Sequence, residues 1–307
     1  MKRILGLMAT TAVTGVLIAG ASPAHALVVS PNPGDSALTS ALISNGAGFS
    51  SYGASYTLGN SAQIGTYTGF TSPPRTIGNG VVMSTGNAAD VVGPYRNDVG
   101  NGEVSTALGG GSTPEINSYA PGHVTNWASS QDAAVLTVNF TLSSPSAIAF
   151  NFMFGSVEFP VFTSSYTDAF FAFLDGNQIT FDASGNAVQV GSSFASLLNT
   201  DDTNTIFTGV GANPGNDAHG LLGLLTTTSA TLTAGAHTLQ FEIADTNDQA
   251  LDSAIFLNDL HTTTGGSGPV TGGGGGTIVP EPASMALLGV GLVALGVTRR
   301  RGAKRSA

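Results

Sequence analysis

Apolar and polar residues alternate along much of the chain between residues 134 and 260. Leu136, Val138 and Phe140 are separated by Thr and Asn, and the Phe-rich segment 148–154 continues the pattern. A period of two is typical of strands that bury one face. Gly, Asn and Asp residues follow most of these segments and favour turns. The further strands predicted in this half of the chain are 169–174, 178–181, 221–226, 229–232, 237–244 and 254–260.

The preceding part of the chain has the same strand pattern and one helix. Strands are predicted at 51–58, 62–70 and 80–86. Asp35 or Ser36 can cap a short helix. Leu38 and Leu42 fall on one face of that helix, and Gly46 follows its end. Many short strands with one helix predict an all-β fold, namely an antiparallel β-sandwich of jelly-roll-like type.

The N-terminus has the layout of a secretory signal peptide. Two basic residues precede an apolar run, and small residues ending in Ala24-His25-Ala26 follow it. The run is too short for an ordinary membrane anchor, which is the alternative interpretation. We therefore expect a signal-peptide helix in residues 1–26, export across the inner membrane and cleavage by signal peptidase after Ala26.

The C-terminus is organised as a second targeting signal. Five glycines precede Pro280-Glu281-Pro282, then comes an apolar run at 283–297, and Arg299-Arg300-Arg301 follow. The run is shorter than the roughly 20 residues of a typical membrane span. This order resembles the PEP-CTERM sorting signal of Gram-negative bacteria. The resemblance implies recognition by an exosortase, which removes the hydrophobic helix after transient anchoring. A plain single-span anchor is the alternative. The predicted organisation is a signal peptide at 1–26, a β-sandwich domain at 27–264, a Gly-rich linker at 265–279 and a sorting signal at 280–305.

Removing the two end signals makes the charge of the remaining body strongly negative. Only Arg75 and Arg96 remain of the nine basic residues, whereas eighteen of the nineteen acids remain, so the body carries −16. Such a surface excludes nucleic acid as a partner and attracts divalent cations. The chain has no cysteine, so its stability depends on core burial or bound ions.

Several motifs of the body, taken in order, resemble one bacterial family, the choice-of-anchor L domain. The resemblance extends over residues 38–260 and implies a β-sandwich surface module without a known catalytic activity. Family members commonly carry two acids and a Tyr in the loop before the proline, where this chain has Val157, Glu158 and Phe159. The motifs are VVMSTGNAADV (81–91), DAAVLTVNF (132–140), FGSVEFPVF (154–162), YTDAFFAFLDG (166–176) and FEIADTNDQALDSAIFL (241–257).

Acidic residues gather in two of the predicted loops. Asp245, Asp248 and Asp252 lie between two strands, and Glu158 and Asp168 flank the loop after the central strand. Calcium prefers six to eight hard oxygen ligands, so these five residues are predicted to bind it. The alternative is that the acids form turns by bonding their own backbone. The spacing does not match an EF-hand.

Residues 87–131 lack a regular pattern and contain Tyr95, Tyr119 and Trp127. Aromatic side chains with a few polar groups are typical of sugar sites, so this long loop is a candidate for binding exopolysaccharide. A loose surface insertion is the alternative.

The sequence contains no enzyme motif that we recognise. His-Glu-x-x-His and Gly-x-Ser-x-Gly are both absent, although Glu158 and Asp168 could form a glycosidase pair. We therefore expect a non-enzymatic structural or adhesive module of the cell surface or extracellular matrix, as in a biofilm. A carbohydrate-binding module is the alternative, and a glycoside hydrolase is the weakest of the three hypotheses.

Overall fold

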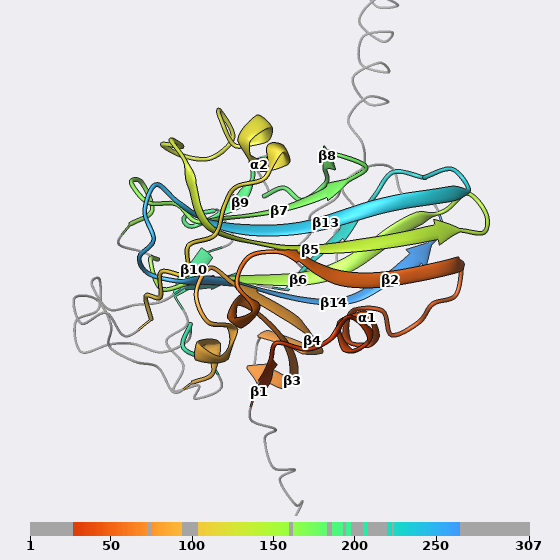
Figure 1. The fold of residues 1–307 in the computed structure, drawn as a ribbon, viewed down its shortest axis with the longest axis horizontal. Coiled ribbons are helices and arrows are strands. Elements are labelled where there is room, and N and C mark those ends of the chain that lie inside the picture. The colour runs from red at the N-terminus through yellow and green to blue at the C-terminus, as the bar shows by residue number, and fades with distance from the viewer. Residues whose placement is uncertain are drawn as a thin grey trace, which may run out of the picture.

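The computed structural model forms a sandwich of two antiparallel sheets (Figure 1). The fold class expected from the sequence is therefore confirmed. The structure describes residues 27–72, 75–93, 104–159, 162–182, 186–192, 195–197, 205–207, 220–222 and 224–264. Both predicted end signals, with Ala24, Ala26, Pro280, Glu281, Pro282 and Arg299 to Arg301, lie outside these residues, as does Tyr95.

The larger sheet has eight strands. Its central strand β14 pairs with β4 on one side and with β6 on the other, and β12 also pairs with β6. The order of hydrogen-bonded neighbours is β1-β3-β4-β14-β6-β11-β10. In that order the strands are Val28–Pro31, Ile64–Ser72, Arg75–Ser84, Ser253–Thr263, Ala147–Ser156, Gly220–Leu222 and Ala195–Leu197, and β12 is Leu225–Thr228.

The smaller sheet has six strands and is centred on β13. This strand pairs with β5 along one edge and with β7 along the other, whereas β2 forms an outer edge beside β5. In the order β2-β5-β13-β7-β8, with β9 beside β7, the strands are Phe49–Leu58, Ser130–Leu142, Gly235–Thr246, Ala169–Leu174, Asn177–Gln178 and Val188–Gln189.

Two short α-helices accompany the sheets in the described part of the chain, whereas the sequence predicted one helix for the body. Helix α1, Asp35–Leu42, is the predicted helix, but its N-cap is Gly34, which offers no side-chain cap. Helix α2, Pro114–Tyr119, lies in the segment that we expected to be irregular. Thr113 caps α2 by accepting a hydrogen bond from the Ile116 N–H, and Pro114 occupies the first turn. These are standard helix-start signals, but six residues are too few to show helical periodicity. Two 3₁₀ helices, Ser61–Gln63 and Ala88–Val91, are the other helical segments of the described residues.

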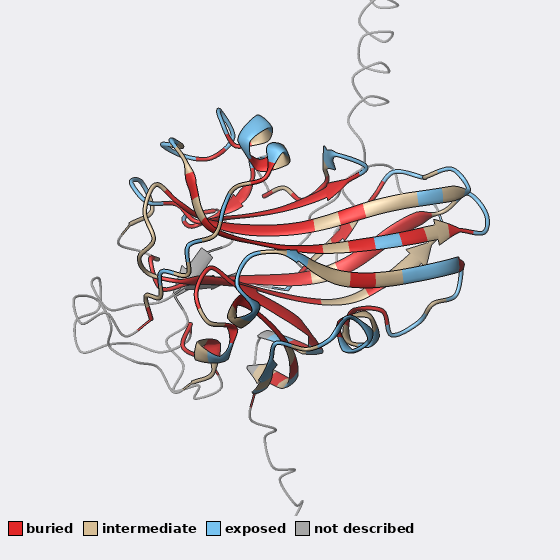
Figure 2. Ribbon diagram, in the orientation of Figure 1, coloured by how far each residue is buried: buried red, intermediate tan, exposed pale blue. Residues whose placement is uncertain are grey.

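Aromatic rings from both sheets meet in the centre of the sandwich. Phe150 of β6 packs edge-on against Phe241 of β13, with 4.8 Å between ring centroids. Phe241 in turn stacks against Phe170 of β7 at 6.4 Å. All three side chains are fully buried, as are Leu38 and Leu42 of α1, which belong to the same core. Figure 2 shows that buried residues occupy much of the strands of both sheets. This contact between the sheets is therefore the main apolar core.

Two further apolar clusters cover the outer faces of the sheets. On the larger sheet, Tyr67 and Phe256 pack with Val91 of the second 3₁₀ helix and with Val104. On the smaller sheet, Phe171 and Phe173 of β7 pack beneath Ile116 of α2. Strands β6 and β7 are consequently buried on both faces along most of their length.

Two of the strands predicted from the sequence are wrong in part because side chains take over their hydrogen bonds. The strand predicted at 178–181 is only β8, which ends at Gln178. Beyond it, the side-chain oxygens Gln178 Oε1 and Thr180 Oγ1 accept from the Ala172 N–H of β7, each at 3.0 Å. At 229–232 Ser229 Oγ accepts from the Ile148 N–H, and single bridges at Ala230 and Leu232 replace a continuous strand. The segment predicted at 221–226 is divided between β11 and β12.

The central contact gives a stability prediction. Phe241→Ala should lower the free energy of unfolding by about 3–5 kcal/mol because it leaves a cavity between the sheets. Val28→Ala on β1 is the control, since Val28 is 56 % exposed and its loss should cost less than about 0.5 kcal/mol. Urea unfolding of both variants measures the difference. Similar losses in the two variants would contradict the assignment of the core.

Candidate functional site

Two carboxylates face each other at one end of the smaller sheet. Ala244 of β13 pairs with Ala169 of β7, so the next cross-strand position places Asp245 beside Asp168. Both side chains are fully buried. Side chains alternate along a strand, and Ile243 belongs to the core between the sheets, so Asp245 also points into the sandwich. Like charges in such a cross-strand pair are unfavourable unless something neutralises them.

Asp168 has hydrogen-bond donors from both sheets. Its Oδ2 accepts from the Ser253 hydroxyl of β14 at 2.7 Å, and its Oδ1 accepts from the Thr246 N–H at 3.2 Å. The backbone N–H of Asp168 donates to Glu158 Oε2 at 3.4 Å. Glu158 is itself only 1 % exposed. The two acids that flank the β6–β7 loop therefore lie together, and they connect that loop to β14.

Asp245 has the least satisfied carboxylate of the site. It lies beside Thr85 and Asp168, yet neither of its oxygens accepts a hydrogen bond of normal geometry. Burial raises the pKa of Asp245 well above its ordinary value, and the charge of Asp168 raises it further. An unpaired buried carboxylate costs several kcal/mol unless it takes a proton or a cation.

Burial also raises the pKa of Glu158 and of Asp168. For Glu158 the neighbouring charge of Asp168 adds to the effect of burial. For Asp168 the hydrogen bond from Ser253 opposes it but does not cancel it. Asp248 raises the pKa of both groups, so it lies within electrostatic reach of them.

Asp252 extends the acidic group toward the larger sheet. Its Oδ1 accepts from the Thr106 N–H at 2.9 Å, whereas its Oδ2 has no partner and lies over Gly86. A Cβ at residue 86 would approach this oxygen to 1.8 Å, so only glycine leaves room for the carboxylate. Burial raises the pKa of Asp252 to about 7, and the charges of Asp90 and Asp132 contribute.

Asp132 is a member of this group that the sequence analysis did not identify. It sits at a bulge of β5 with a φ of 43°, and its Oδ1 accepts from the N–H groups of Gly109 and Gly110. Its Oδ2 is buried without a partner. In the sequence analysis Asp132 is only the first residue of the motif at 132–140. Its position before a buried apolar run was the one available signal.

The structure thus brings the five predicted calcium ligands to one end of the sandwich. Glu158 and Asp245 each lie beside Asp168. Asp248 is within electrostatic reach of Glu158 and Asp168, and Asp252 is within reach of Asp245. Within the described ranges, however, no three Asp, Glu, His or Cys side chains converge in a geometry that would hold a metal ion. Calcium binding stays a prediction.

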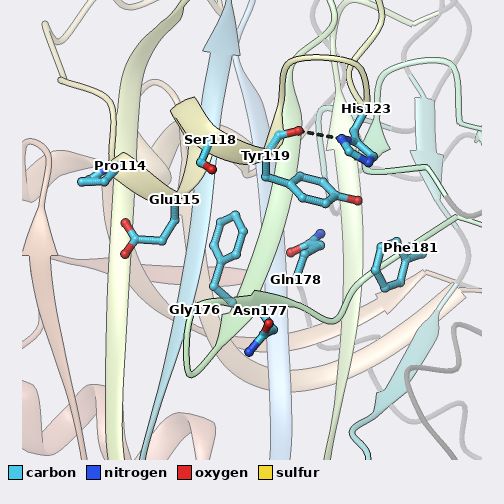
Figure 3. Close-up of a pocket in the computed structure, with 10 residues that line it drawn as sticks. Pro114, Glu115, Ser118, Tyr119, His123, Gly176, Asn177, Gln178 and Phe181 are labelled. Carbon is cyan, nitrogen blue, oxygen red and sulfur yellow. Dashed lines mark hydrogen bonds between the residues drawn. The ribbon is translucent and has the colours of Figure 1, made fainter.

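A pocket of about 530 Å³ lies beside α2. Figure 3 shows Tyr119 above Gln178, with Glu115 and Phe181 on either side. The ring of Tyr119 stacks on His123, with centroids 4.1 Å apart, and His123 Nδ1 lies 2.7 Å from the Tyr119 carbonyl oxygen. A carbonyl oxygen only accepts, so Nδ1 is the donor in this contact. The pocket combines aromatic faces with carboxylate and amide groups.

Of the three aromatic residues that we proposed for sugar binding, only Tyr119 lines this pocket. Trp127 is half-buried and packs against the apolar cluster beneath α2. Tyr119 also packs against Phe171 and Phe173, so its ring is partly a core residue. The residues His123, Gln178 and Phe181 were missed because they come from two separate segments.

The glycosidase hypothesis for Glu158 and Asp168 disagrees with their surroundings. The two side chains are 1 % and 0 % exposed, and neither lines the pocket beside α2. A glycosidase must place both carboxyl groups against a sugar ring. In the described structure both carboxyl groups are buried away from that pocket.

A comparison with protein families agrees with this architecture. The model of the choice-of-anchor L domain matches residues 35–261. The chain belongs to the choice-of-anchor L family. A second model, the PEP-CTERM protein-sorting motif, matches residues 279–301. No curated protein and no solved structure matches the chain.

The two matches establish the cellular route of this choice-of-anchor L protein in outline. The sorting motif implies export, membrane anchoring before sorting, and an exosortase as a processing partner. Both matches are to families of non-enzymatic surface or sorting modules. Within the part of the chain that the structure describes, no helix has the length and apolarity needed to span a membrane.

Glu242 is a buried acid outside the group around Asp168 and Asp245, and it gives a prediction for the pH dependence of stability. Burial raises the pKa of Glu242 from 4.5 to about 7, although Thr113 donates to its carboxylate. The native state then holds a proton that the unfolded state has lost, so the free energy of unfolding should fall as pH rises from about 4.5 through about 7. Glu242→Gln should make this decline shallower, because the amide cannot titrate.

Thermal or urea unfolding between pH 4 and 8 measures this effect. Asp35→Asn is the matched control, since Asp35 is exposed on α1 and should leave the pH profile as in the parent protein. A profile of Glu242→Gln with the parent's slope would show that Glu242 is already ionised in the native state.

Proposed function

We propose that this protein is a structural module of the cell surface or extracellular matrix, retained there after its sorting signal has been processed. The observation that carries the proposal is the pairing of a choice-of-anchor L body with a C-terminal sorting motif in one chain. The strongly acidic composition of the body supports it, because such a charge keeps neighbouring copies apart and gathers divalent cations from a matrix.

The edges of the two sheets support a role at high local concentration. The larger sheet ends in β1 and β10, with four and three residues, and the smaller one ends at β8 with two. Its other edge, β2, is longer but is interrupted by two register shifts against β5. Short or bulged edges limit pairing between sheets of different molecules. A matrix protein built in this way can be crowded without aggregating through its edges.

Processing of the sorting signal is the first test. Pro282→Ala should leave the C-terminal tail attached and move the protein into the membrane fraction, because it alters the tripeptide of the motif. Pro269→Ala, in the preceding Gly-rich stretch, is the matched control and should be processed like the parent protein. Cell fractionation and mass spectrometry of the C-terminus measure both. A released parent protein that still contains Arg299 to Arg301 would contradict processing.

A carbohydrate-binding module is the second candidate function, and the pocket beside α2 favours it. Sugar sites combine an aromatic face with a few oriented polar groups. Tyr119 stacked on His123 supplies the face, and Glu115 and Gln178 supply a carboxylate and an amide. The occupant that we propose is an exopolysaccharide segment, since the protein is sorted to the surface.

Glycan-array binding tests this second function with two pocket variants. His123→Ala and Glu115→Gln should each weaken binding about tenfold, the loss expected for one important contact of roughly 1.4 kcal/mol. His123 is exposed, so its removal should spare the fold. His261→Ala, on β14, is the matched control. Binding that is equal in all variants would exclude this pocket, and an absence of binding by the parent protein would remove the function.

A further inference from the structure

The body contains far more buried acid than it has cationic side chains to neutralise. Besides Asp182, six carboxylic side chains are buried: Asp132, Glu158, Asp168, Glu242, Asp245 and Asp252. The body has only two arginines and no lysine. The ion pairs among the described residues involve only His237 and His261, each with an exposed or half-exposed Asp. None of these six acids takes part in an ion pair with a described residue, so they need hydrogen bonds, protons or an external cation to offset their burial.

A second observation points to the place where a cation would bind. Asp245 is fully buried, and neither of its oxygens accepts a hydrogen bond of normal geometry, although Thr85 and Asp168 lie beside it. It lies one register position beyond the Ala244–Ala169 pair, beside Asp168. Buried polar groups in native proteins are nearly always paired. A carboxylate with two orphaned oxygens next to a second carboxylate is the arrangement that a bound cation would satisfy.

Neutral oxygen atoms surround the same point. The hydroxyl of Ser253 contacts Asp168, and the hydroxyl of Thr85 lies beside Asp245 and accepts from the Ser253 N–H at 2.9 Å. Glu158 closes the site from the β6–β7 loop. Two carboxylates with neutral oxygens are sufficient for a hard cation, so the absence of a three-carboxylate geometry in the described residues does not conflict with it.

We propose that a calcium ion binds between Asp168 and Asp245 inside the acidic end of the sandwich. The ion neutralises the cross-strand acid pair and connects the β6–β7 loop to β13 and β14. Calcium fits better than the alternatives. Zinc prefers His and Cys, whereas the chain has no cysteine and the described His123, His237 and His261 contact other groups. Magnesium needs a regular octahedron and keeps its waters.

The proposal predicts a linked change in stability. At a free calcium concentration a hundred times the dissociation constant, the equilibrium constant for unfolding should fall about a hundredfold. For a domain of this size, the melting midpoint should rise by about 5–10 °C relative to the protein in chelator. The same concentration of magnesium should give a smaller rise.

The decisive experiment compares the full exported protein with Asp245→Asn and Asp35→Asn, each in calcium and in EGTA at pH 7.5. Metal analysis after equilibrium dialysis counts the bound ions directly. We expect one calcium per chain and a midpoint rise for the parent protein and for Asp35→Asn, which replaces an exposed acid. Asp245→Asn should bind no calcium and should melt at the same temperature in both buffers. Asn has the shape of Asp without its charge, so this variant should still fold.

Two outcomes would overturn the proposal. If the parent protein binds no calcium at millimolar concentration and melts equally in both buffers, the acid pair is held by a shared proton. In that case Asp245→Asn should be more stable than the parent protein in either buffer, because it removes the repulsion. If Asp245→Asn binds calcium as the parent does, the ion lies elsewhere. Neither result affects the sorting test, which depends on the C-terminal motif alone.

Discussion

The alternation of side chains along β13 is the constraint on which most of the structure depends. This strand is hydrogen-bonded on both edges, to β5 and to β7, so its register is fixed on both sides. Leu239, Phe241 and Ile243 consequently point into the core between the sheets. The same alternation carries Asp245 inward two residues later. A slip by one residue would move Phe241 out of the core between the sheets, so the fold cannot turn Asp245 to the other face of β13 without losing that core.

The buried acids are thus a consequence of the register that produces the core. Hydrogen bonds from the surrounding residues offset only part of the free energy that burying these carboxylates costs. Donors from Ser253, Thr246 and the backbone of residues 106–110 satisfy one or both oxygens of Asp168, Asp252 and Asp132. Asp245 receives none of normal geometry. Hydrogen bonds to the charged form would lower the pKa of these groups, yet burial outweighs them for Asp168, Asp245 and Asp252. The native state is therefore sensitive to whatever proton or cation its surroundings supply.

The sequence predicted the elements whose signal is local and missed those that depend on side-chain hydrogen bonds or on partners far along the chain. Helix α1 and the long strands β5, β6, β7, β13 and β14 have clear periodicity and were found. The prediction at 229–232 was wrong because the Ser229 hydroxyl occupies a backbone donor of β6. The gathering of acids was expected from their loops. Asp132 and the donors on residues 106–110 were missed, because no sequence pattern relates them to Asp252, which lies more than a hundred residues away.

One signal in the sequence could have revealed the role of the irregular segment that contains α2. The run Ala169–Leu174 is apolar at every position, which is typical of a strand that is buried on both faces. Phe170 faces the core between the sheets, so Phe171 and Phe173 must be covered from outside. Residues 113–127 supply that cover, with Ile116, Tyr119 and Trp127 packed against these rings. The pocket beside α2 lies where this cover meets the β7–β8 turn, so its aromatic lining is a direct result of burying the outer face of β7. A ligand bound there would contact a surface already held rigid by the core, which favours recognition with little loss of conformational entropy.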